Sequence, residues 1–207
     1  MKTVLLLSGG LDSAVCGALC RNRGDEIHAL TFDYGQRHVT EIEFARSLAT
    51  WIGAARHDIV DLRAFGGLSR SALTSSPESI PKGTLSVGIA PTFVPARNLL
   101  FLSYAIGVAG SNGADSVCTG VNAVDYSGYP DCRPEFVDAF RGAAREAMPR
   151  LVRVETPLIH MSKRQIAVLS RDLRVPETLS CYDPIDGSSC GQCDSCLIRK
   201  DAFDVPN

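Results

Sequence analysis

Four cysteines near the carboxyl end of the chain have the spacing of a metal site. Cys181, Cys190, Cys193 and Cys196 follow the pattern C-x8-C-x2-C-x2-C. Two-residue spacers let successive thiolates turn back onto one ion, and small or polar residues between them suit tight turns and N–H bonds to sulfur. The spacing predicts one structural Zn²⁺ ion with four cysteine ligands. An iron–sulfur cluster is the open alternative, because C-x2-C-x2-C also occurs in ferredoxins.

A glycine-rich string near the amino end has the residue types of a phosphate-binding turn. It consists of Ser8, Gly9, Gly10, Leu11, Asp12 and Ser13. Paired glycines let the main chain approach a ligand closely, and the N–H groups at the start of the following helix attract an anion. Asp12 either caps that helix or binds a Mg²⁺ ion that bridges the phosphates. The string is neither a Walker loop nor a dinucleotide fingerprint. It resembles the S-G-G-x-D-S signature of the PP-loop ATP pyrophosphatases, which cleave ATP between the α and β phosphates.

The elements that position these residues alternate between short apolar runs and segments of helical period. We predict strands at 2–7, 26–32, 56–62 and 115–119, with a short fifth strand at 152–154, and helices at 12–23, 40–52, 97–111, 134–148 and 162–173. Thr40 with Glu43, and Ser162 with Gln165, have capping-box spacing. Continuous apolar strands alternating with helices predict an α/β fold, an open parallel sheet with helices on both faces. In such sheets, ligands bind beyond the carboxyl ends of the strands.

The pattern breaks twice along the chain. Residues 63–95 are rich in Ser, Gly and Pro and predict a long lid or binding loop. After residue 175 the sequence becomes rich in Cys, Gly and Asp. We therefore expect a nucleotide-binding domain at 1–175 and a small zinc-binding module at 176–207.

Composition narrows the class of protein. The 207 residues are 45% hydrophobic and 21% charged, with a net charge of −2 and no Lys/Arg run, which argues against a dedicated nucleic-acid binder. No stretch has the length or hydrophobicity of a membrane span, and the amino-terminal apolar run is too short for a signal peptide. We expect a cytoplasmic enzyme whose eight cysteines stay reduced.

Polar strings lie where loops should be, after the predicted strands and at the start of the predicted helix 97–111. They are DYGQRH at 33–38, VPARN at 94–98, DYSGYPDCR at 125–133 and ETPL at 155–158. Together with SGGLDS and the cysteine spacing, these strings make the chain resemble the QueC family of 7-cyano-7-deazaguanine synthases, from Leu7 to Arg199. Two departures are Asn122-Ala123-Val124, where the family often has a Cys-Glu-Thr type string, and Lys200-Asp201-Ala202-Phe203, which lacks the usual Gly.

The resemblance implies an adenine nucleotide alpha hydrolase-like fold and a specific reaction. The family converts 7-carboxy-7-deazaguanine and ammonia to a nitrile, through adenylated carboxylate and amide intermediates. AMP is the leaving group in both rounds, so one nucleotide site serves twice. Alternatives are a PP-loop enzyme that modifies tRNA, a related deazaguanine ligase, and a non-catalytic nucleotide-binding module whose zinc tail recruits a protein.

The resemblance also implies roles for individual residues. The phosphate loop, residues 8–13, holds the pyrophosphate, with Asp12 acting through Mg²⁺. Arg97 and Lys163 are candidate cationic stabilisers near either the phosphates or the substrate carboxylate. Candidate substrate-binding residues are Tyr34, Tyr129, Asp131 and Arg133. His38 is either a proton relay or a structural histidine. The expected cofactors are one Zn²⁺ and ATP with Mg²⁺. The expected partners are the deazaguanine and ammonia, in a homodimer that binds no nucleic acid and no membrane.

Overall fold

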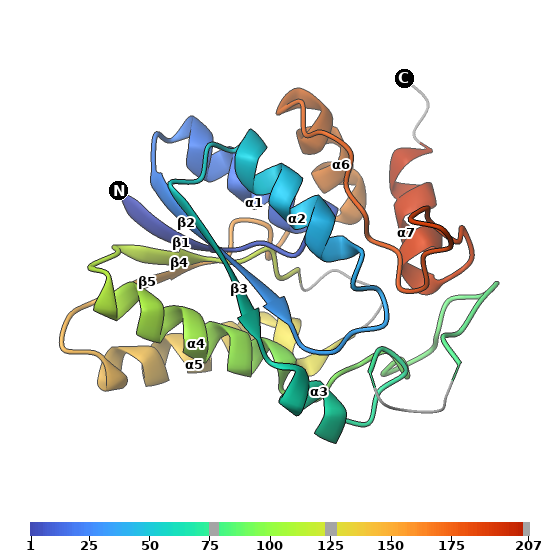
Figure 1. The fold of residues 1–207 in the computed structure, drawn as a ribbon, viewed down its shortest axis with the longest axis horizontal. Coiled ribbons are helices and arrows are strands. Elements are labelled where there is room, and N and C mark those ends of the chain that lie inside the picture. The colour runs from blue at the N-terminus through green and yellow to red at the C-terminus, as the bar shows by residue number, and fades with distance from the viewer. Residues whose placement is uncertain (75–78, 123–127, 205–207) are drawn as a thin grey trace.

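Five parallel strands form one open sheet. The structure, a computed structural model, describes residues 1–74, 79–122 and 128–204 (Figure 1). The strand order is β3-β2-β1-β4-β5, with every neighbouring pair parallel. The strands are β1 (Lys2–Leu6), β2 (Glu26–Asp33), β3 (Arg56–Asp61), β4 (Ser116–Cys118) and β5 (Arg153–Glu155). The predicted fold class is confirmed, and the short fifth strand lies one residue beyond its predicted range.

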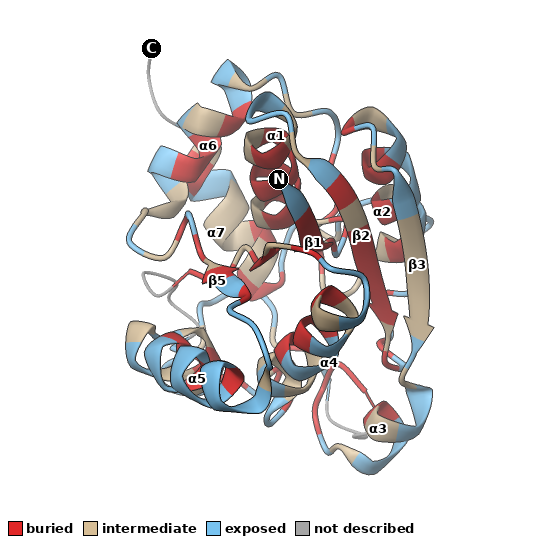
Figure 2. Cartoon of the chain, turned by 90° about the vertical axis from the view of Figure 1, so that its left-hand side faces the viewer, coloured by how far each residue is buried: buried red, intermediate tan, exposed pale blue. Residues whose placement is uncertain are grey.

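Helices cover both faces of this sheet, as the alternating sequence predicted. One face packs against α1 (Leu11–Asn22), α2 (Glu41–Trp51) and α6 (Lys163–Asp172), and the other against α4 (Arg97–Ser111) and α5 (Pro134–Ala147). In β1, Val4 joins the core under α4, whereas Leu5 joins the core under α1. Figure 2 shows the buried residues on the sides of α1 and α4 that face the strands. The continuous apolar character of the central strands follows from this two-sided burial.

One of the two predicted capping boxes forms and the other does not. Ser162 caps α6, and its side chain and that of Gln165 exchange hydrogen bonds with the main chain as predicted. The prediction for Thr40 and Glu43 was wrong, because Thr40 has helical angles (φ −54°, ψ −25°) and makes no side-chain cap. A turn over residues 37–40 precedes α2, and Glu41 N–H donates to the carbonyl of His38. The first amides of α2 therefore bond to carbonyls of that turn and do not need the hydroxyl.

Three short elements lie outside the predicted pattern. Helix α3 (Arg63–Leu68) begins the otherwise irregular stretch 63–95, the 3-10 helix η1 (Pro130–Cys132) precedes α5, and α7 (Asp194–Phe203) ends the described chain. Figure 1 shows α7 beside α6, and Arg164 of α6 pairs with Asp201 of α7 at 3.0 Å. The division of the chain at residue 175 stays a prediction. Within the described ranges, no helix is both long and apolar enough to cross a membrane.

Candidate active site

A cavity of about 290 Å³ lies beyond the carboxyl ends of β1, β2 and β4. Its walls come from the phosphate loop, the start of α4, the segment after β4 and the C-terminal segment (residues 176–204). Of the residues predicted from the sequence, the lining includes Ser8, Gly10, Leu11, Asp12, Ser13, Tyr34, Tyr129, Arg97 and Lys163. The parallel sheet therefore brings residues far apart in sequence to the edge where ligands are expected.

The phosphate loop is held by its own serines and by a close contact with α2. The Ser13 hydroxyl donates to the Gly10 carbonyl at 2.9 Å and accepts from the Ser8 main-chain N–H at 3.2 Å. Gly9 has φ +84°, and a Cβ atom there would lie 2.2 Å from the Glu41 carbonyl oxygen. Gly9 itself does not line the cavity, so its part is to let the loop pass α2. The two serines, predicted as part of the pyrophosphate site, thus also shape the turn.

Asp12 and Lys163 form an ion pair at the edge of this loop. Lys163 Nζ lies 2.5 Å from Asp12 Oδ2, and the two side chains are 20% and 24% exposed. Lys163 begins α6 and Asp12 lies in the first turn of α1, so the pair joins two helix starts. Gly120 packs against the same turn, since a Cβ there would lie 2.9 Å from the Asp12 carbonyl carbon. A carboxylate and an ammonium group thus face the cavity together.

Arg97 and Tyr34 form the opposite wall. Arg97 Nη1 donates to the Tyr34 hydroxyl at 3.2 Å, and the guanidinium lies 5.7 Å from the centre of the Tyr34 ring. Burial raises the pKa of Tyr34 to about 12, so its phenol stays protonated. Ala96, directly before Arg97, has φ 59°, a left-handed conformation that costs a non-glycine residue about 1 kcal/mol. Such strain beside a cation in a cavity is typical of a functional site.

The remaining predicted substrate residues lie around this wall. The Tyr129 hydroxyl is hydrogen-bonded to Thr92 at 2.7 Å. Asp131 is buried, and its carboxylate accepts from the Asn98 main-chain N–H at 2.9 Å, in the first turn of α4. Arg133 is exposed and donates to the Gly128 carbonyl. Neither Asp131 nor Arg133 lines the cavity, so a substrate contact by either side chain stays a prediction.

A carboxylate that was not predicted as a site residue, Glu41, also faces the cavity. Glu41 Oε1 accepts from Gln36 Nε2 at 2.9 Å and lies 3.4 Å from His38 Nε2. His38 is buried, with its ring 6.1 Å from that of Tyr182. The only sequence signal for Glu41 is its place just after the polar string DYGQRH.

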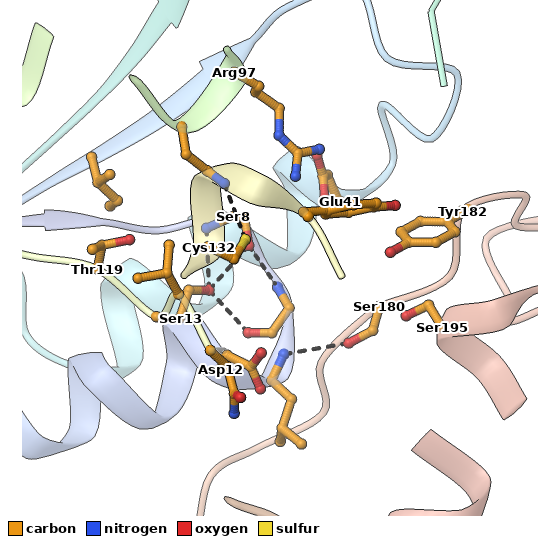
Figure 3. Close-up of a pocket in the computed structure, with 18 of the residues that line it drawn as sticks. Ser8, Asp12, Ser13, Glu41, Arg97, Thr119, Cys132, Ser180, Tyr182 and Ser195 are labelled. Atoms are coloured by element: carbon orange, nitrogen blue, oxygen red, sulfur yellow. Dashed lines mark hydrogen bonds between the residues drawn. The ribbon is translucent and has the colours of Figure 1, made fainter. Parts of the chain in front are cut away.

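The C-terminal segment, predicted only as a zinc-binding module, adds polar groups to the cavity. The Leu11 main-chain N–H donates to Ser180 Oγ at 3.4 Å, and Figure 3 shows Ser180 and Tyr182 on the opposite side of the cavity from Thr119. Arg199 of α7 donates to Thr178 Oγ1 at 2.9 Å, and burial lowers the pKa of its guanidinium. Ser180, Tyr182 and Arg199 all line the cavity.

The four cysteines predicted as metal ligands come together in space. Their sulfur atoms all lie within 4.8 Å of one another, and two of the separations are 4.0 Å. A tetrahedral site with Zn–S bonds of about 2.3 Å has sulfur–sulfur edges of roughly 3.8 Å. The cluster (Cys181, Cys190, Cys193 and Cys196) therefore fits a four-coordinate metal site.

Main-chain N–H groups point at these sulfurs, as thiolate ligands require. Cys181 Sγ accepts from the N–H groups of Asp183 and Cys190, at 3.3 and 3.2 Å. Burial alone would raise the pKa of the Cys190 thiol, but the N–H groups of Gln192 and Cys193 donate to it and lower its pKa to about 7. The turns between the cysteines thus stabilise negative charge on sulfur.

The chain is similar along nearly its whole length to one known protein family. The model of the family described as "Queuosine biosynthesis protein QueC" matches residues 2–206. A 7-cyano-7-deazaguanine synthase of Rhodopirellula baltica is 47% identical over 98% of this chain and 87% of its own length. Its counterpart in Anaeromyxobacter dehalogenans is 48% identical, over 98% of this chain and 91% of its own.

A solved structure is similar at the level of the fold alone. The NH3-dependent NAD synthetase of Campylobacter jejuni superposes with a TM-score of 0.53 and 18% identity, over 84% of this chain and 64% of its own. The family match covers almost the whole sequence, and it includes the phosphate loop and the four cysteines. The chain belongs to the QueC family of queuosine biosynthesis proteins.

Proposed function

We propose that this chain is a 7-cyano-7-deazaguanine synthase, the activity for which its relatives at 47% and 48% identity are named. The enzyme converts 7-carboxy-7-deazaguanine and ammonia into the nitrile, and each turnover consumes two molecules of ATP. The observation that carries the proposal is one cavity that holds the phosphate loop on one side and the half-buried cation Arg97 on the other.

The chemistry follows from leaving groups. A carboxylate oxygen attacks the α-phosphorus of ATP, which forms an acyl adenylate and releases pyrophosphate. Ammonia then displaces AMP, which carries that oxygen away, and the added nitrogen loses one proton to give the amide. In the second round the amide oxygen attacks ATP and pyrophosphate leaves. Expulsion of AMP with loss of both amide protons then gives the nitrile. Both rounds need the same site for the pyrophosphate that leaves.

The chain's own residues suit these steps. N–H groups at the start of α1 hold phosphate oxygens, and Lys163 neutralises charge as pyrophosphate leaves. Arg97, fixed by the Tyr34 hydroxyl, is placed to bind the substrate carboxylate. Tyr34 and Tyr129 provide ring faces for the flat deazaguanine. Asp12 is the carboxylate that would hold Mg²⁺, which supplies charge neutralisation of the phosphates.

The metal in the four-cysteine cluster is proposed to be zinc. Four thiolates with sulfur atoms within 4.8 Å leave no open coordination position, which is typical of structural zinc. Its part is to fold the C-terminal segment against the phosphate loop.

The other partners come from the proposed reaction. Ammonia is the nitrogen donor, and the substrate is a free base, not a nucleic acid. The homodimer and the cytoplasmic location expected from the sequence stay predictions.

One reaction mixture tests the proposal. The protein is incubated with ATP, ammonium and 7-carboxy-7-deazaguanine, and all products are analysed by mass spectrometry. The expected result is the nitrile, with two AMP and two pyrophosphate molecules for each product. Release of ADP and phosphate, or formation of product only when tRNA is added, would contradict it.

A further inference from the structure

Arg199 links the four-cysteine cluster to the nucleotide cavity. It lies on α7 three residues after the metal ligand Cys196, a spacing that places both side chains on one side of a helix. Cys196 joins the cluster, while Arg199 lines the cavity. The position of this guanidinium therefore depends on the same helix that the metal anchors.

The guanidinium is half-buried and its direct hydrogen-bond partners are neutral. It donates to Thr178 Oγ1 at 2.9 Å and to Ser180 Oγ at 3.4 Å, and its charge lies 5.1 Å from the Phe203 ring centre. The ion pairs found between described residues do not include Arg199. The Cys196 sulfur and two carboxylates, Asp12 and Glu177, act on its charge from a distance, and Asp12 is already paired with Lys163. A partly buried cation of this kind favours an anionic ligand.

A single hydroxyl group, that of Ser180, lies between Arg199 and the phosphate loop. Ser180 Oγ accepts from Arg199 Nη1 and from the Leu11 main-chain N–H, each at 3.4 Å. Leu11 is the first residue of α1, whose N–H groups suit a phosphate. Arg199 and the start of α1 thus approach the same part of the cavity from two different segments.

We propose that Arg199 binds the β- and γ-phosphate oxygens of ATP, so that the zinc-anchored helix contributes directly to the nucleotide site. The inference rests on the proposed function in one respect, namely that ATP binds in this cavity. The substrate carboxylate is the other oxyanion that the cavity receives. Arg97 is the cation for that group, because it projects from α4 and is held by Tyr34, away from Ser180. The metal cluster then has a role in substrate binding as well as in folding.

Equilibrium binding of nucleotides tests this role without any turnover. Arg199→Met removes the charge but keeps a stem to pack near Phe203, and Arg199→Lys restores a cation. Lys200→Met is the matched control, because Lys200 is the adjacent, exposed cation of the same helix. Calorimetry measures the affinity of each variant for a non-hydrolysable ATP analogue, for AMP and for 7-carboxy-7-deazaguanine, and elemental analysis gives the metal content.

Loss of a charge-assisted contact to phosphate weakens binding about tenfold or more. Arg199→Met should show this loss for the ATP analogue, with less than about threefold change for AMP and for the deazaguanine and with one metal per chain. Arg199→Lys should recover part of the affinity, and Lys200→Met should bind like the wild type. If the methionine variant loses metal, Arg199→Gln, which keeps a donor for Thr178, is measured in its place.

Two outcomes would overturn the inference. One is an unchanged affinity for the ATP analogue in the metal-loaded variant. The other is a loss confined to the deazaguanine, which would assign Arg199 to the substrate carboxylate. Both differ from failure of the proposed function, in which the wild type binds ATP but forms no nitrile.

Discussion

Asp12 is a carboxylate in a place where phosphate is expected, and its partner explains how it is tolerated. The ammonium group of Lys163 lies 2.5 Å away, so the pair carries no net charge before ligands arrive. When ATP binds, a cation at Asp12 and the freed ammonium of Lys163 can both face phosphate oxygens. Loss of the carboxylate should therefore damage chemistry much more than folding.

Asp12→Asn should lower kcat for pyrophosphate release by about 100-fold or more, because it removes the carboxylate that would hold Mg²⁺ beside the developing pyrophosphate. Its melting temperature should stay close to that of the wild type. Asp172→Asn, at the exposed end of α6, serves as the control and should have wild-type kcat. A kcat within threefold of the wild type for Asp12→Asn would remove Asp12 from the catalytic site.

Gly9 shows how one residue fixes the path of the phosphate loop. Both Gly9 and Gly24 have positive φ, 84° and 77°, but only at Gly9 would a Cβ atom clash, 2.2 Å from the Glu41 carbonyl oxygen. Gly24→Ala should cost about 1 kcal/mol of unfolding free energy, the price of a left-handed alanine. Gly9→Ala should cost at least about 1 kcal/mol more in urea denaturation. Equal costs for the two variants would mean that the contact with α2 is not tight.

At the scale of elements, the sequence pattern predicted the sheet and its five large helices well. Each central strand is an apolar run because it is buried on both faces, and each large helix has an apolar side that the sheet covers. Helix α7 was missed because it alternates metal-ligand, apolar and charged residues without a clear apolar stripe. Its stability comes from the cysteine cluster and from α6, and local patterns carry no signal for either.

The two capping-box sequences give a matched pair of predictions at this scale. Ser162→Ala should destabilise the protein by about 1 kcal/mol, because it removes the bond to the Gln165 N–H. Thr40→Ala should change stability by less than about 0.5 kcal/mol, because its hydroxyl caps nothing. Chemical denaturation measures both, and a loss as large at Thr40 as at Ser162 would contradict the structure of the α2 start.

The four-cysteine cluster holds a segment of the long irregular stretch as well as the C-terminal segment. Lys82 forms a β-bridge with Cys193 and an ion pair with Asp183 at 2.7 Å, and the Gly83 N–H donates to the Gln192 carbonyl. Figure 1 shows the irregular stretch after α3 running beside the turn that leads into α7. Loss of the metal should therefore loosen two segments that are distant in sequence.

Cys193→Ser should release the metal and increase amide hydrogen exchange in residues 82–86 and 179–199, while β1 stays protected. Cys16→Ala is the control, because Cys16 is buried in the core under α1 and is not part of the cluster. It should keep one metal per chain. If Cys193→Ser keeps one metal per chain, or if amide exchange at 82–86 is unchanged, the cluster does not hold these two segments in place.

At the scale of the whole molecule, the site is built where three separate parts of the chain meet. The sheet edge brings the phosphate loop and Tyr34 together, α4 adds Arg97, and the C-terminal segment adds Ser180 and Arg199. The first group was predictable, because loops after parallel strands share one edge. The position of the C-terminal segment was not predictable. Hydrogen bonds of Leu179 and Ser180 with the phosphate loop set its path, and no sequence pattern indicates these bonds.

Transfer of the substrate's own oxygens to AMP is the central claim of the proposed chemistry. The direct measurement uses 7-carboxy-7-deazaguanine labelled with ¹⁸O in both carboxylate positions, with ATP and ammonium, and mass spectrometry of every product. The account predicts that each AMP carries one ¹⁸O atom, that pyrophosphate carries none, and that the nitrile is free of oxygen from the carboxylate. Unlabelled AMP, or label in pyrophosphate or phosphate, would contradict it.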